Sequence, residues 1–204
     1  SEMNIIPNLS VDCVIFGFDA KELSVLLVKR ELSKNGKIIF ADHTLTGHHV
    51  IKGENTDEAA TRVLKSITGF KNIYLEQFHT FSDTSRLASE KDTIWRENFP
   101  HNIDEHVISV GYYSLVDSAA ICPDEEHRNV SWYPINDLPE LGFDHQQIIE
   151  KALEQLRIKV RHEPVVFELL PEKFTISQLQ DIYEAILGTS FDRRNFRKKV
   201  SQMK

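Results

Sequence analysis

The sequence has few of the features that mark an extracellular or membrane protein. Its 204 residues include only two cysteines, Cys13 and Cys122, which is too few for a disulfide framework or a cysteine metal motif. No apolar run is long enough to span a bilayer, and no stretch has the pattern of a signal peptide. We therefore expect a cytoplasmic protein that does not associate with a membrane.

Charge is distributed unevenly along the chain. The net charge is -7, yet residues 157–204 carry ten basic against six acidic residues, while the remainder carries 14 against 25. Residues 192–204 hold six basic residues and one acidic residue. An acidic body with a basic end favours contact between that end and a polyanion. A solvated, charged helix face is the other interpretation of the charge alone.

Several segments have the composition of β-strands. Residues 10–30 predict a hairpin, because two runs rich in Val, Ile, Leu and Phe flank a turn at 19–22. Lys29 and Arg30 end its second strand, where they would face either a bound ligand or solvent. Further strands are expected at 37–40, 73–81, 106–116 and around 132–133.

The segment 82–105 is long and mostly polar for a loop inside a compact domain. Trp95 and Phe99 within it argue against a fully disordered chain. A lid over a ligand, a dimer contact and a mobile insertion all remain open as its role.

Residues 45–70 organise the rest of the chain as a loop, a helix and a glycine stop. Asn55 can cap a helix with Glu58 as its capping-box partner, and Gly69 suits the left-handed residue that ends one. Apolar residues between them recur at helical spacing and predict one buried face: Ala60, Val63, Leu64 and Ile67.

This stretch resembles the Nudix box, which reads Gly, five residues, Glu, seven residues, then Arg-Glu, a Glu pair and a closing Gly, and which usually follows a Leu-Pro-Gly lead-in. Gly47, Glu54, Arg62 and Gly69 match that frame, and His48 lies where the motif has its own Gly. Other residues occupy the three helical Glu positions: Val63, Ser66 and Ile67.

These replacements predict the loss of Nudix hydrolysis. Members of the family cleave nucleoside diphosphates linked to another group, using Mg²⁺ or Mn²⁺ held by the helical carboxylates. Hard divalent ions need oxygen ligands, and Glu54 alone would not assemble a metal-activated water. A substitute site from His48, His49, Glu54 and His79 is disfavoured, because adjacent residues of a strand point to opposite faces. We expect no catalytic residue, no metal site and no cofactor.

The tripeptide Phe143-Asp144-His145 is expected to begin a helix, with Asp144 as its N-cap. A further helix should run from Thr175 or Ser177 to Gly188, and a basic helix should begin at Asp192. Helix, short turn and basic helix form the helix-turn-helix pattern, whose second helix lies in the major groove of DNA.

Residues 167–171, 174–185 and 192–198, behind a Nudix-like domain, resemble the Nudix-related transcription regulators of the NrtR and AraR groups. The resemblance covers nearly the whole chain. It implies a Nudix-like domain that senses a small molecule, which is ADP-ribose in the NrtR group and L-arabinose in the AraR group. It also implies a winged helix that binds a palindromic operator, and a homodimer. The Arg62-Val63-Leu64 box looks closer to AraR.

We therefore predict an α+β protein, with a Nudix-like α/β/α sandwich and a mixed sheet over 1–156. A winged helix-turn-helix domain would follow over 157–204, where the chain stops after the recognition helix without a wing. Ligand contacts, carried over from position in the fold, are predicted at Lys29, Arg30, His48, Glu54 and Arg62. DNA contacts are predicted on the basic helix, whose donors suit phosphates and base edges: Arg193, Arg194, Asn195, Arg197, Lys198 and Lys199.

Two other functions remain open. One is a Nudix hydrolase of a nucleoside diphosphate derivative with an atypical metal site, which metal-dependent cleavage of ADP-ribose would favour. The other is a protein-binding module whose basic helix packs on a partner, which binding that survives high salt without any DNA binding would favour.

Overall fold

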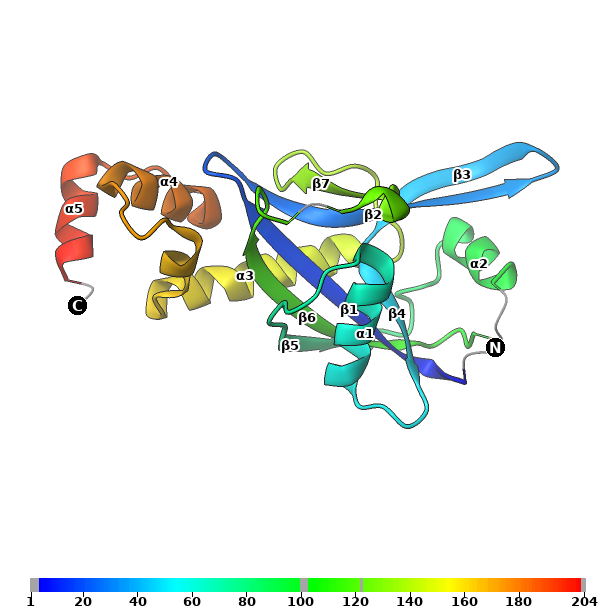
Figure 1. The fold of residues 1–204 in the computed structure, drawn as a ribbon. Helices are drawn as coiled ribbons and strands as arrows, with labels where there is room; N and C mark the ends of the chain where they lie inside the picture. The colour runs from blue at the N-terminus through cyan, green and yellow to red at the C-terminus, as the bar shows by residue number, and fades with distance from the viewer. Residues whose placement is uncertain (1–3, 100–102, 122, 203–204) are drawn as a thin grey trace.

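A computed structural model describes residues 4–99, 103–121 and 123–202, so Cys122 lies outside the described residues (Figure 1). Seven strands in these ranges form one mixed sheet in the order β3-β2-β1-β6-β5, with β4 also paired to β1 and β7 to β2. The β1–β6 pair is parallel, and the other named pairs are antiparallel. The strands are β1 (Ile5–Phe18), β2 (Leu23–Lys34), β3 (Lys37–Thr44), β4 (Thr46–Ile51), β5 (Glu76–Phe81), β6 (Ile108–Asp117) and β7 (Val130–Pro134).

The central strand β1 divides the interior into two cores. Side chains alternate between the faces of a strand, and in β1 the alternation separates two apolar clusters. Val14 and Phe16 belong to one cluster, and Cys13 and Ile15 belong to the other; all four are fully buried. By this alternation Asp12 points to the same face as Val14.

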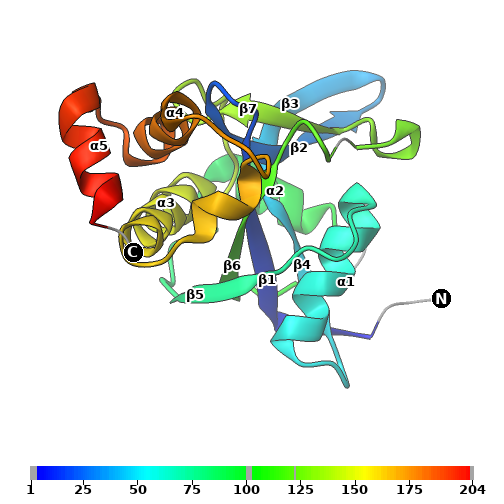
Figure 2. The same cartoon turned by 60° about the vertical axis from the view of Figure 1, so that its left-hand side comes forward.

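One helix covers each face of the sheet (Figure 2). Helix α1 (Thr56–Thr68) packs on the face of Cys13, and helix α3 (His145–His162) packs on the face of Val14. The predicted capping box of Asn55 and Glu58 is present, and Gly69 ends α1 at φ 78°. The predicted α/β/α sandwich is therefore confirmed.

Asp144 occupies the predicted N-cap of α3, but its side chain makes no capping hydrogen bond. The helix continues across residue 156 to His162, so the first residues assigned to the second domain still belong to α3. The boundary between the domains at 156 and 157 stays a prediction.

Two further helices follow α3: α4 (Ile176–Leu187) and α5 (Arg193–Ser201). A short 3-10 helix, η2 (Val165–Leu169), precedes them. Thr175 caps α4 with Gln178 in a capping box, and Gly188 ends it at φ 66°. No strand follows α5 up to Gln202, the last described residue. Figure 1 shows α4 and α5 beyond one end of α3. Within the described ranges, no helix is long and apolar enough to cross a membrane.

Candidate functional site

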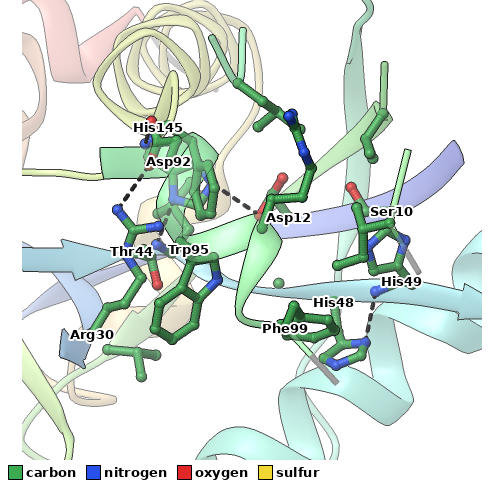
Figure 3. A pocket seen from close by; sticks show the side chains of 18 of the residues that line it. Ser10, Asp12, Arg30, Thr44, His48, His49, Asp92, Trp95, Phe99 and His145 are labelled. Atoms are coloured by element: carbon green, nitrogen blue, oxygen red, sulfur yellow. Dashed lines mark hydrogen bonds and ion pairs between the residues drawn. The ribbon is translucent and has the colours of Figure 1, made fainter. Parts of the chain in front are cut away.

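A cavity of about 570 Å³ lies between the sheet and the segment that follows β5. Small-molecule sites typically enclose about 300–1,000 Å³. The walls come from β1, β2, β4, the segment after β5 and the first residue of α3 (Figure 3). The cavity is therefore large enough for a metabolite, and it lies where the core sheet meets a loop.

The described residues of the segment 82–105 form one wall of this cavity. It contains the helix α2 (Glu90–Glu97), capped by Ser89, which the sequence did not predict. Trp95 and Phe99 from this segment line the cavity together with Arg86 and Asp92. Of the three roles left open for this segment, its position beside the cavity favours a lid over a ligand.

An internal ion network holds α2 against the sheet. The Arg30 guanidinium donates to Asp42 through Nε at 2.8 Å and Nη2 at 2.7 Å, and Nη2 also donates to Asp92 of α2 at 2.8 Å. The guanidinium carbon Cζ of Arg30 lies 4.4 Å from the Phe143 ring centroid, which is a cation–π distance. Burial alone would raise the pKa of Asp42, but hydrogen bonds from Arg30 and Lys91 lower that pKa below its usual value. Arg30 thus lines the cavity while binding α2 to the sheet.

A second cluster of polar side chains forms the floor of the cavity. Asp12 accepts a hydrogen bond from the Ser109 hydroxyl, and its Oδ1 lies 3.3 Å from Nε2 of His145. Arg86 donates to both carboxylate oxygens of Asp144, at 3.0 and 2.9 Å, and lies 3.8 Å from Asp12. Burial alone would raise the pKa of Asp12, but His145, Arg86 and Ser109 together lower it to about 2. Asp12 is therefore an ionised carboxylate at neutral pH.

His145 is held in one tautomer. Its Nδ1 accepts a hydrogen bond from the Leu45 backbone N–H at 2.9 Å, so Nδ1 carries a lone pair. The ring proton is then on Nε2, which faces Asp12. This arrangement joins the first residue of α3 to the central strand β1.

The five predicted ligand residues separate into two groups. Lys29, Arg30 and His48 line the cavity. Glu54 and Arg62 lie outside it and bind each other, with Nη2 and Oε1 2.6 Å apart, and the resulting hydrogen bond is the main cause of the lowered pKa of Glu54. Because Glu54 also accepts from the Ile51 N–H at 2.8 Å, this pair fixes the loop that leads into α1.

Both His48 and His49 line the cavity, with ring centroids 5.8 Å apart. Adjacent residues of a strand point to opposite faces, yet both of these side chains reach the cavity. His48 Nδ1 accepts a hydrogen bond from the His49 backbone N–H at 2.8 Å, which turns the His48 ring back along the strand. No group of three or more His, Cys, Asp or Glu side chains in the described residues is arranged to hold a metal ion.

Helix α5 presents its polar residues outward from an apolar anchor. Phe196 is buried and packs against Tyr183 and Phe191, with ring centroids 5.9 and 5.8 Å apart. The side chain of Glu184 accepts from the Phe191 N–H at 2.8 Å, which braces the turn before α5. All six residues predicted to contact DNA are exposed: Arg193, Arg194, Asn195, Arg197, Lys198 and Lys199.

Comparison with protein families agrees with this architecture. A model of the NUDIX domain matches residues 7–154. The chain belongs to the Nudix family. A second model, the NrtR DNA-binding winged helix domain, matches residues 166–204. The Nudix domain is therefore followed by a winged helix domain of the NrtR type, as the sequence predicts.

Relatives of this Nudix protein include regulators and an enzyme. The ADPR responsive transcriptional repressor NtrR of Acinetobacter baylyi is 28% identical over 199 residues, covering 95% of this chain and 72% of that protein. The crystal structure of Shewanella oneidensis NrtR complexed with a 27mer DNA is 28% identical, with a TM-score of 0.71, covering 95% of this chain and 82% of that one. An ADP-ribose pyrophosphatase of Methanocaldococcus jannaschii is 27% identical over 144 residues, covering 71% of this chain and 72% of the enzyme.

The Nudix helix α1 does not fit the family's metal ion. Val63, at the first helical Glu position, is 1% exposed and packs in the core beneath α1. Ile67 packs against the same core, and Ser66 is exposed. None of the three offers a carboxylate, so these positions supply no anionic oxygen for a hard divalent ion.

Sequence reasoning missed the polar residues of the cavity floor and of the wall that covers it. Asp12 lies inside an apolar strand run, and a charged residue there was an available signal, because buried charges are rare unless paired. Arg86 and Asp92 lie in the segment 82–105, where no local pattern distinguishes them from the other charged residues.

Proposed function

We propose that this Nudix protein is a transcription regulator whose cavity binds a small metabolite and whose helix α5 binds operator DNA. The observation that carries the proposal is the exposed basic face of α5, in a winged helix domain of the NrtR type, behind a Nudix helix without carboxylates at its metal positions. The Shewanella oneidensis relative is described in complex with DNA. We expect a palindromic operator and a homodimer, as the resemblance to the NrtR and AraR groups implies.

We infer further that the domain does not hydrolyse nucleotides and that its effector belongs to the ADP-ribose class. The Acinetobacter baylyi relative is named as an ADPR responsive repressor. Trp95 and Phe99 give the cavity two aromatic rings suited to stacking on a base. L-arabinose is the second candidate, since the Arg62-Val63-Leu64 box resembles the AraR group.

DNA binding can be tested by selecting duplexes from a random-sequence pool and measuring their affinity at several salt concentrations. Wild type should bind with an affinity that falls steeply with salt, because neutralised phosphates release counterions. Arg194→Ala should reduce the salt slope by about one for each protomer bound to the duplex. Arg128→Ala, which removes one exposed arginine from the Nudix domain, is the matched control and should leave the slope unchanged.

The effector can be tested on the same complex. ADP-ribose or L-arabinose should change the affinity for the selected duplex without being consumed. Failure of the wild type to enrich any duplex would overturn the regulator proposal. Metal-dependent cleavage of ADP-ribose that is lost in Glu54→Gln would support the hydrolase instead.

A further inference from the structure

The floor of the cavity holds an ionised carboxylate with unused hydrogen-bonding capacity. A carboxylate offers about four lone-pair positions. Among the described residues, Ser109 donates to Oδ2 of Asp12, and Nε2 of His145 lies 3.3 Å from Oδ1. Asp12 is 5% exposed overall and lines the cavity, so its remaining acceptor positions are shielded from bulk solvent and border the cavity.

A glycine keeps this carboxylate accessible. Gly47 pairs with Asp12 across β1 and β4 and also lines the cavity. A Cβ at Gly47 would lie 2.1 Å from Oδ1 of Asp12, so any other residue here would collide with the carboxylate. Gly47, which precedes the position that His48 takes in the Nudix box, thus leaves room in front of an acid in this chain.

The charge of the floor selects the kind of group that can bind there. Asp12 and Asp144 face one guanidinium, that of Arg86, while His145 holds its proton on Nε2, so these groups together carry one net negative charge. A phosphate would be repelled, whereas a hydroxyl group can donate a hydrogen bond to the carboxylate. Ser10, two residues from Asp12 on the same face of β1, adds a hydroxyl to the cavity lining (Figure 3).

We propose that the Asp12 carboxylate is a hydroxyl-binding subsite that recognises the pentose portion of the effector. This inference rests on the proposed function and names the part of the ligand that the floor would hold. The pentose can be a free sugar or the terminal ribose of a nucleotide, because both present hydroxyl groups on adjacent carbons. Trp95, Phe99 and His48 lie elsewhere on the lining and leave the floor to the sugar.

The test is a binding cycle that combines a change in the protein with a change in the ligand. Wild type and Asp12→Asn are titrated calorimetrically with ADP-ribose and with ADP, which lacks the terminal ribose, and with L-arabinose and 2-deoxy-L-ribose, which lacks one hydroxyl. Asp12→Asn keeps the shape of the side chain and removes its charge. Asp137→Asn removes an exposed carboxylate from the loop after β7 and is the matched control.

ADP-ribose and L-arabinose are the fully hydroxylated members of the two ligand pairs. Asp12→Asn should weaken the binding of whichever of them binds wild type by about tenfold or more, because hydrogen bonds to charged groups are stronger than those between neutral groups. ADP should bind wild type and Asp12→Asn equally, and Asp137→Asn should behave as wild type. An effect confined to ADP-ribose identifies a nucleotide effector, and an effect confined to L-arabinose identifies a free sugar.

Equal affinity of wild type and Asp12→Asn for the hydroxylated ligand would overturn the subsite and leave the regulator proposal intact. Absence of binding by both ADP-ribose and L-arabinose to wild type would overturn the effector proposal and the subsite with it. If Asp12→Asn does not fold, the ligand pairs on wild type decide: a truncated ligand that binds as tightly as its parent contradicts the subsite.

Discussion

Helix α1 carries the helical positions of the Nudix box, and helix α5 carries the predicted DNA contacts. The two helices differ in what their side chains contact. In α1 two positions that carry Glu in the Nudix motif hold Val63 and Ile67, which pack into the core, and Arg62 is bound by Glu54. In α5 the apolar anchor is Phe196, and the basic residues are exposed. At these positions α1 directs apolar side chains into the interior, whereas α5 directs basic side chains to the solvent.

The largest effect should come from restoring a carboxylate to α1. Val63→Glu would place an unpaired charge in a fully packed core, and a buried charge without a partner costs about 3–5 kcal/mol. We expect the free energy of unfolding, measured by urea denaturation, to fall by about 4 kcal/mol. Ser66→Glu places another carboxylate on the exposed side of the same helix. This substitution should change the free energy of unfolding by less than about 0.5 kcal/mol. Equal losses from both variants would contradict the difference in burial.

Removing the anchor of α5 should have the next largest effect. Phe196 is 2% exposed, and Phe→Ala in a core costs about 3–5 kcal/mol. Phe196→Ala should therefore destabilise the protein by about 3 kcal/mol and abolish duplex binding, as measured by urea denaturation and fluorescence anisotropy. Phe174, at 38% exposed, is the matched position. A similar loss in Phe174→Ala would show that the stability of this domain does not depend on the anchor.

The same substitution on the two helices sharpens the comparison of their arginines. Arg62→Ala leaves Glu54 without its charged partner and should lower the free energy of unfolding by about 1–2 kcal/mol, since the pair is only partly buried. Arg194→Ala should change the free energy of unfolding by less than about 0.5 kcal/mol. Thermal and urea unfolding of the two variants side by side measures this difference, and a larger loss for Arg194→Ala would reverse it.

The smallest effect is the part of the pH dependence that comes from Glu54 and its partner Arg62. The hydrogen bond from Arg62 lowers the pKa of Glu54 in the folded state. The stabilisation is therefore present above the unfolded pKa of about 4.3 and is lost as pH falls through the lower folded value. Unfolding free energies measured between about pH 6 and pH 3 should decline less steeply for Glu54→Gln than for wild type. Parallel curves would show that the pair contributes nothing to acid stability.

Local features of the fold could be predicted from the sequence, because the residues that determine them lie close together in the chain. The capping boxes that start α1 and α4 each join residues three apart, Asn55 with Glu58 and Thr175 with Gln178. The hairpin of β1 and β2 likewise follows from two adjacent apolar runs around a short turn. The exposed face of α5 was predicted from its charge and spacing.

The cavity could not be predicted in the same way, because its contacts join distant segments. Arg30 and Asp92 are 62 residues apart, and Asp12 and Ser109 are 97 apart. No periodicity relates such pairs, so Glu54 and Arg62 were assigned to a ligand by position alone and lie outside the cavity instead. The acid within the apolar run of β1 was the one local sign of the floor.

Helix α3 is also a mechanical connection between the two halves. Its first residue, His145, lies against Asp12 at the cavity floor, and near its other end Arg157 donates to the Ile186 carbonyl of α4 at 2.8 Å. A helix of 18 residues is about 27 Å long. At that length, a tilt of about 5° about His145 would move the far end by about 2 Å. If the proposed sugar subsite tilts α3 in this way, the displacement near Arg157 would exceed the tolerance of its hydrogen bond to α4.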